Sequence, residues 1–274
     1  MRKPEFIEFE IGPYCNRNCR WHSNALNSSG SKKGYVSDEL WHSFMHELKA
    51  HDYSGWLALH NYNEPLLGPN VYERIQDAKA ISPQTKILIF SNGDPLNKNR
   101  VSTLVLLGID ELRVTLYPNK SKEGRLVNCD LNEFLNRIGV NSSELSYELT
   151  QCGMEYKGLI SGMPLFIIIP IIANNTNRAG SIMFDGEYIR SESCHLPMHS
   201  AAIDYQGNLK VCSQIQDIMN DSDYKVGNIS DNGFFALWNS EKFKNIQNKL
   251  NESNFYVLNK CAFCHHSKHY DPAA

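Results

Sequence analysis

The first two-thirds of the chain alternates between short apolar strands and amphipathic helices. Residues 6–11 alternate apolar and polar side chains with period two, which predicts a strand that ends at Gly12-Pro13. Further strands are predicted over residues 56–60, 86–90 and 111–117. Helices are predicted between them, starting near Ser37 and spanning about 70–80 and 98–107. This alternation indicates βα units and a parallel sheet.

The pattern is weaker over residues 118–160, where only Leu131–Gly139 is predicted to be helical and the rest reads as loop with one short strand. Residues 165–172 then form an apolar run that predicts a buried strand. This run is too short to cross a bilayer, which needs about 20 residues. We expect a soluble protein without a membrane span.

The character of the chain changes near residue 185. Residues 201–212 predict a β-hairpin whose turn contains Gly207, followed by a strand near 227–229. An apolar helical stripe, predicted to be core, contains Phe234, Leu237, Trp238, Phe243, Ile246 and Leu250. We therefore divide the chain into a core of residues 1–185 and a smaller domain of residues 186–274.

Composition narrows the class of protein. The 274 residues are 42% hydrophobic and 21% charged, with a formal net charge of −3, which is ordinary for a soluble globular protein. No strongly basic stretch indicates a nucleic-acid partner, and no apolar segment at the start has the form of a signal peptide. Eight cysteines in such a chain indicate a reducing compartment, so we expect a cytoplasmic protein whose thiols serve metals or catalysis.

The cysteines fall into three sets along the sequence. Cys15 and Cys19 follow the first strand, with His22 three residues further on. Cys129 and Cys152 stand alone. The last set occupies the final third and comprises Cys194, Cys212, Cys261 and Cys264. Four thiolates in this arrangement can hold either an iron–sulfur cluster or a structural zinc ion.

The spacing of Cys15, Cys19 and His22 resembles the Cys-x3-Cys-x2-Cys loop of the radical S-adenosylmethionine (SAM) enzymes, except that histidine replaces the third cysteine. The resemblance covers nearly the whole chain and is greatest to the radical SAM dehydrogenases of aminocyclitol antibiotic biosynthesis. It implies an α/β fold with a partial (βα)6 TIM-type barrel, followed by a small α+β twitch/SPASM-like iron–sulfur domain. In such barrels the chemistry gathers at the C-terminal ends of the strands.

The resemblance also implies ligands for two [4Fe–4S] clusters and SAM. Cys15, Cys19 and His22 would hold the SAM-binding cluster, and the C-terminal cysteines would hold an auxiliary cluster. SAM itself would be bound by residues after the second, third and fourth strands and by an Asn-Arg-x-Gly element, namely Asn63, Glu64, Pro65, Ser91, Asn92, Thr115 and Arg178.

His22 leaves three possibilities open. Imidazole can bind cluster iron, but replacing an anionic thiolate with a neutral ligand raises the reduction potential and slows SAM cleavage. The site is then a working histidine-ligated cluster, a degenerate inactive site, or a substituted version of an active enzyme.

The function that the resemblance implies is radical oxidation of a secondary alcohol on a small sugar-like or aminocyclitol substrate. The auxiliary cluster would accept an electron, a flavodoxin or ferredoxin would supply reducing electrons, and Arg178 would lie close to the reacting groups. A thiol such as Cys152 or Cys129 that returns hydrogen to the substrate radical would give epimerisation instead. The sequence is also compatible with a peptide-modifying enzyme, or with a binding protein that has lost radical chemistry through His22.

Overall fold

The computed structural model describes residues 1–19, 34–120, 126–127, 129–171, 177, 179, 189–215, 222–255 and 258–264. Its centre is a ten-stranded sheet in the order β12-β11-β10-β1-β2-β3-β4-β9-β8-β7. The strands are β1 (Phe6–Phe9), β2 (Trp56–Ala58), β3 (Lys86–Ser91), β4 (Glu111–Thr115), β7 (Ser146–Leu149), β8 (Gly153–Ile160), β9 (Met163–Pro170), β10 (Ser200–Ile203), β11 (Asn208–Lys210) and β12 (Lys225–Asn228). A separate hairpin pairs β5 (Asn119–Lys120) with β6 (Leu126–Val127).

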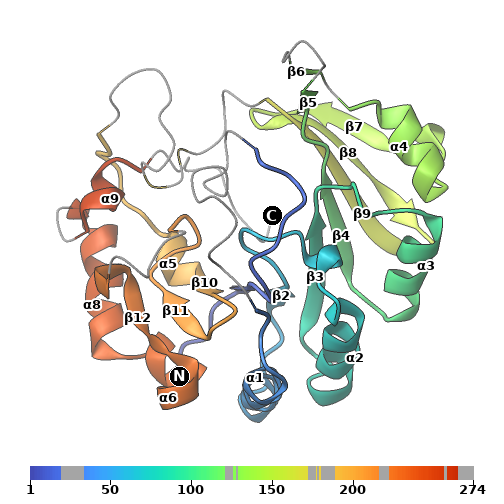
Figure 1. The fold of residues 1–274 in the computed structure, drawn as a ribbon. Helices are drawn as coiled ribbons and strands as arrows, with labels where there is room; N and C mark the ends of the chain where they lie inside the picture. Colours follow the sequence, from blue (N-terminus) through green and yellow to red (C-terminus); the bar gives the residue numbers. More distant parts are fainter. Residues whose placement is uncertain are drawn as a thin grey trace.

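Six neighbouring strands, β10-β1-β2-β3-β4-β9, are all parallel to one another. Their C-terminal ends therefore lie along the same edge of the sheet, as the predicted partial barrel requires. In Figure 1 the C-terminal elements, in orange and red, lie on one side of β1, and the green and yellow strands lie on the other. The parallel sheet predicted from the alternating pattern is confirmed.

The helices described are α1 (Asp38–Ala50), α2 (Val71–Ile81), α3 (Lys98–Leu106), α4 (Leu131–Ile138), α5 (Leu196–His199), α6 (Ile229–Asn232), α7 (Phe234–Trp238), α8 (Glu241–Asn251) and α9 (Asn259–Ala262). Helix α1 begins where predicted, because the side chain of Ser37 accepts a hydrogen bond from the Leu40 amide at 3.2 Å. Helix α4 ends at Gly139, whose φ of +79° favours glycine.

The two faces of strand β1 pack against different apolar clusters, one toward the helices and one toward the inside of the barrel. Ile7 and Phe9 point toward the helices, and the Phe9 ring lies 4.9 Å from that of Phe44 on α1. Phe6, on the other face, packs with Ala58 and Leu88. Because side chains alternate along a strand, Glu8 shares this inner face with Phe6. Glu8, the one polar residue of β1, therefore lies inside the barrel.

The structure has several features that the sequence did not predict. Residues 146–160, expected to be mostly loop, form β7 and β8, because β8 pairs along its whole length with β9. The predicted apolar stripe is buried as expected, but it divides into α7 and α8 where Ser240 caps the second helix. Strand β10, from the predicted C-terminal domain, pairs with β1, so one sheet runs through both parts of the chain.

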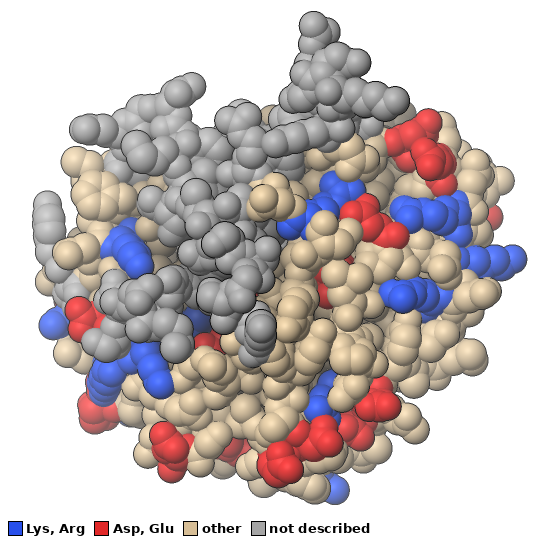
Figure 2. All heavy atoms as spheres, in the orientation of Figure 1, with Lys and Arg blue, Asp and Glu red and all other residues tan. Residues whose placement is uncertain are grey.

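The described surface has mixed charge. On the face seen in Figure 2, basic and acidic side chains are interspersed over the described residues. Within the described ranges, no helix is both long enough and apolar enough to cross a membrane.

Candidate active site

The two cysteines of the N-terminal motif lie in the loop that follows β1, at the C-terminal edge of the parallel strands. Cys19 is buried and Cys15 is half-buried. Burial raises the pKa of the Cys19 thiol to about 11, and the charge of Arg17 opposes this shift. Because burial raises the pKa of both thiols, we expect them to be protonated in the metal-free chain. A thiol that coordinates a metal loses its proton. His22 lies outside the described residues.

Arg17, between the two cysteines, clamps this loop to the neighbouring strand ends. Its guanidinium contacts Asp94 through two hydrogen bonds, at 2.6 Å from Nε and 2.5 Å from Nη2. It also donates to the carbonyl of Tyr117, after β4, at 2.9 Å. Bidentate arginine–carboxylate pairs fix geometry as well as charge. The cysteine loop is therefore held by residues after β3 and β4.

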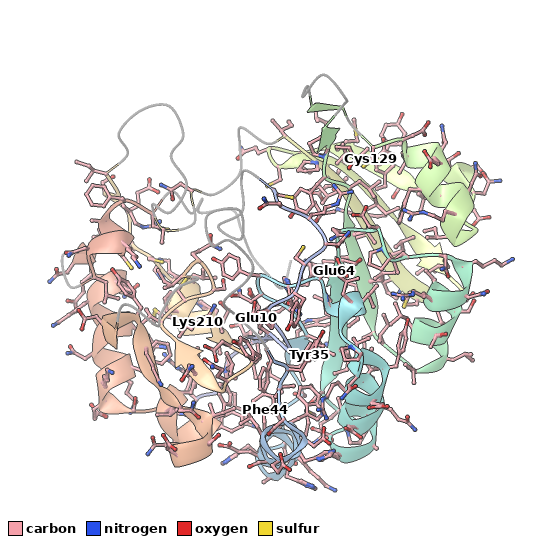
Figure 3. The ribbon with its side chains drawn as sticks, viewed as in Figure 1. Glu10, Tyr35, Phe44, Glu64, Cys129 and Lys210 are labelled. Carbon is pink, nitrogen blue, oxygen red and sulfur yellow. The ribbon has the colours of Figure 1, made fainter. Side chains whose placement is uncertain are left out.

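A second tie to the same loop comes from Glu64, which lies near the middle of the molecule (Figure 3) and is only 2% exposed. Its amide donates to the carbonyl of Tyr14 at 2.8 Å. Its carboxylate accepts from the amides of Asn92 at 2.6 Å and Leu66 at 3.2 Å. Burial nevertheless dominates and raises the pKa of Glu64 to about 7.

The other candidate SAM ligands in the described ranges lie at these same strand ends. The Asn63 side chain accepts from the Asn61 amide at 3.1 Å, and Pro65 begins a short 3-10 turn. The Ser91 hydroxyl accepts from the Gly93 amide at 3.1 Å.

Asn92 contacts the cysteine loop directly, and Thr115 is the last residue of β4. The Asn92 side-chain amide donates to Asn16 at 2.8 Å and lies 3.8 Å from the sulfur of Cys15. Thr115 pairs with Ile168 of β9 and is half-buried. The structure therefore brings Cys15, Glu64 and Asn92 together.

A buried polar network joins the inside of the barrel to the C-terminal region. The ammonium of Lys210 on β11 donates to the side chain of Asn61 and, at 3.0 Å, to the carbonyl of Ile215. Asn61 in turn donates to Glu8. Burial lowers the pKa of Lys210, and the nearby carboxylates of Glu10 and Glu8 oppose this. Figure 3 shows Lys210 and Glu10 close to each other. These contacts fix the loop that carries Cys212 against the barrel.

The four C-terminal cysteines line one cavity, together with apolar side chains, Gln214 and Arg190. Burial raises the pKa of the Cys212 thiol well above its usual value, and the other three cysteines add to the shift. Burial likewise raises the pKa of Cys261 to about 12. Among the described residues, no three His, Cys, Asp or Glu side chains already converge on one metal-ion position. A cavity lined by several thiols fits a cluster, whose ligands must be spread around its iron atoms.

Arg178 lies outside the described residues, but the residues on either side of it are described. Asn177 donates to the carbonyl of Phe263 at 2.6 Å, and Ala179 lines the cysteine cavity. Cys152 is exposed at the β7–β8 turn, where its carbonyl accepts from the Ile171 amide at 2.8 Å. The contacts described for Cys152 involve neither Cys15 nor Cys19.

Sequence reasoning missed Arg17, Asp94, Lys210 and Arg190. Arg17 and Asp94 carried a usable signal, because one lies between the two cysteines and the other directly after the strand end at Asn92-Gly93. Lys210 and Arg190 carried none, since a lysine in a hairpin and an arginine before a cysteine are usually exposed.

Comparisons with known proteins agree with this arrangement. Residues 194–265 match the SPASM family, an iron–sulfur cluster-binding domain. The S-adenosyl-L-methionine-dependent 2-deoxy-scyllo-inosamine dehydrogenase of Niallia circulans is 24% identical over 261 residues, which are 94% of this chain and 91% of that protein. The SPASM match favours a cluster over zinc at the C-terminal cysteines.

Two solved structures of BtrN are similar along the whole chain. The crystal structure of BtrN in complex with AdoMet and 2-DOIA has a TM-score of 0.75, and that of BtrN in an open conformation has a TM-score of 0.67. Each is 21% identical and covers 97% of this chain and 94% of its own. The chain therefore contains a SPASM domain at residues 194–265, and along nearly its whole length it is similar to an S-adenosyl-L-methionine-dependent dehydrogenase.

Proposed function

We propose that this chain is a BtrN-like radical SAM dehydrogenase, which oxidises a secondary alcohol of an aminocyclitol. The observation that carries the proposal is the thiol-lined cavity within the SPASM match, in a chain similar throughout to an aminocyclitol dehydrogenase. Oxidation of an alcohol to a ketone removes two electrons, and hydrogen abstraction removes only one of them. The reaction therefore needs an electron-accepting site in addition to the SAM site.

The first site would hold a [4Fe–4S] cluster through Cys15, Cys19 and His22. When bound, cluster and SAM supply a 5′-deoxyadenosyl radical that abstracts hydrogen from the substrate. The chain's part is to hold the ligands in place, and the pair of Arg17 with Asp94 suits that role because it fixes the loop between the two cysteines.

The SAM ammonium would be received near Glu64, with Asn63, Pro65, Ser91 and Asn92 around it. A carboxylate is a suitable partner for a group with three N–H donors and a positive charge. Burial raises the pKa of Glu64 to about 7 in the chain without SAM. The positive charge of an ammonium beside it would favour the ionised carboxylate. Thr115 remains our candidate for contacts to the ribose and carboxylate of SAM, and Arg178 would either bind the SAM carboxylate or lie near the substrate hydroxyl.

The second site would hold the auxiliary [4Fe–4S] cluster through Cys194, Cys212, Cys261 and Cys264. When bound, it supplies a one-electron acceptor for the oxidation. The buried Lys210–Asn61 contact would keep this site at a fixed distance from the barrel interior.

Epimerisation is the second candidate function. The position of Cys129 near the cysteine loop makes it a better candidate than Cys152 for the thiol that returns hydrogen. Cys129 donates to the carbonyl of Tyr117 at 3.0 Å and lies 4.0 Å from Arg17 of the cysteine loop. A thiol there would return hydrogen to a substrate radical. Solvent deuterium at the reacting carbon, without ketone, would identify this outcome.

The test is anaerobic reaction of the reconstituted protein with SAM, dithionite and an aminocyclitol such as 2-deoxy-scyllo-inosamine. We expect 5′-deoxyadenosine and a ketone in equal amounts, and faster turnover in His22→Cys. The proposal fails if neither the wild type nor His22→Cys forms 5′-deoxyadenosine with any aminocyclitol while both clusters are intact.

A further inference from the structure

A buried arginine forms part of the wall of the cysteine cavity. Arg190 is 7% exposed and lines the cavity together with Cys194, Cys212, Cys261 and Cys264. It precedes the first of these cysteines by four residues and lies in no helix or strand. Its position is therefore set by its own contacts.

Those contacts are hydrogen bonds to backbone carbonyls. Its guanidinium donates to the carbonyls of Glu192 at 2.9 Å, Ser193 at 3.2 Å and Cys264 at 3.1 Å. Its own amide donates to the carbonyl of Ala262 at 2.8 Å. The guanidinium thus joins the segment before Cys194 to the segment that carries Cys261 and Cys264.

The apolar surroundings of the Arg190 guanidinium strengthen the effect of its charge on groups inside the cavity. The Phe255 ring lies 5.6 Å from the guanidinium carbon, and Leu196, Ile215 and Leu250 line the same cavity. The guanidinium carries a positive charge, and a charge in a mostly apolar cavity is screened less than it would be in water.

We propose that Arg190 raises the reduction potential of the iron–sulfur cluster held by the C-terminal cysteines, and so makes that cluster a better electron acceptor. The proposal rests on the proposed function, in which one electron passes from the substrate radical to this cluster as the substrate loses a proton and becomes a ketone. Reduction adds one negative charge to the cluster, and a fixed positive charge on the cavity wall stabilises that charge. Charge and hydrogen bonding around a cluster are known determinants of its potential.

The test is a redox titration of the auxiliary cluster, followed by electron paramagnetic resonance, in Arg190→Gln and Arg190→Lys. A Cys15→Ala/Cys19→Ala background removes the first cluster, so that the signal belongs to the second. The matched control is Lys260→Gln, which removes a positive charge beside Cys261; the Lys260 ammonium lies 5.0 Å from the Tyr224 ring and outside the cavity lining.

We expect Arg190→Gln to shift the equilibrium toward the oxidised cluster by about tenfold or more, which is a fall of ~59 mV for a one-electron couple. Arg190→Lys keeps the charge and should shift it much less, and Lys260→Gln should leave it unchanged. Iron and sulfide are measured first in the background protein. No cluster there would contradict the proposed function itself.

Several results would overturn the inference alone. One is a loaded Arg190→Gln cluster with an unchanged potential. Another is an equal fall in Arg190→Gln and Arg190→Lys, which would assign the effect to the lost carbonyl contacts. Failure of Arg190→Gln to hold its cluster would also overturn it, because Arg190 would then be a structural residue.

Discussion

Glu64 offers a test of the strand-end site that needs neither substrate nor cluster. Its pKa in the folded chain is raised by burial from 4.5 to about 7, so at intermediate pH the folded state keeps a proton that the unfolded state releases. The stability that this proton contributes is fully present below pH ~4.5 and is lost as pH rises through ~7. The metal-free protein should therefore become less stable as pH rises through this window.

The size of the effect follows from the two pKa values. One pKa unit corresponds to ~1.36 kcal/mol. Part of the loss already occurs below pH 5, so the linkage relation with pKa values of 4.5 and about 7 gives a loss of about 2.5 kcal/mol of unfolding free energy between pH 5 and pH 8. Glu64→Gln does not titrate. It also loses an acceptor for the Asn92 or Leu66 amide, which lowers its stability by a constant amount that does not depend on pH.

The assay is urea unfolding of metal-free wild type and Glu64→Gln at several pH values, under reducing conditions without oxygen. Other titrating groups are common to both proteins, so the difference between their slopes isolates Glu64. The wild type should lose about 2–3 kcal/mol relative to the variant from pH 5 to pH 8. Parallel pH profiles would refute the claim that this carboxyl is buried with a raised pKa.

Three further predictions concern the SAM site, the cysteine loop and the contact between the two parts of the chain. SAM affinity, measured by calorimetry, should be about tenfold weaker at pH 6 than at pH 8 if SAM binds ionised Glu64, and Glu64→Gln should abolish this dependence. Arg17→Gln should halve the iron content of the reconstituted protein, from about eight irons to about four, and unchanged iron would show that the pair with Asp94 is dispensable. Glu47→Ala removes the carboxylate that accepts from the first two amides of α7, both at 2.8 Å, and should cost about 2 kcal/mol in urea unfolding without changing turnover.

The parallel core was predictable because each strand and helix has its own local signal. The period-two alternation of residues 6–11 and the cap at Ser37 both correspond to elements of the structure. Strands β7 and β8 were not predictable, since β8 is held mainly by backbone pairing to β9 and β7 by pairing to β8, and both bury few side chains. Backbone pairing between strands leaves no periodic pattern in the sequence when few side chains are buried.

The candidate site divides in the same way. Cysteine spacing and strand ends made Cys15, Glu64 and the C-terminal cysteines candidates, because those signals are local. The role of Glu64 as a tie between loops depends on Asn92 and Tyr14, which are distant in sequence. Arg190 could not be found from sequence, since its burial depends on carbonyls on both sides of the cysteine cavity.

The central claim is that this chain abstracts a hydrogen atom from an alcohol carbon and then removes one more electron. It is tested most directly with an aminocyclitol deuterated at that carbon, in an anaerobic reaction with SAM and dithionite. We expect one deuterium in 5′-deoxyadenosine for each ketone formed, and recovered alcohol that keeps its deuterium. Unlabelled 5′-deoxyadenosine, or labelled 5′-deoxyadenosine with recovered alcohol and no ketone, would contradict it.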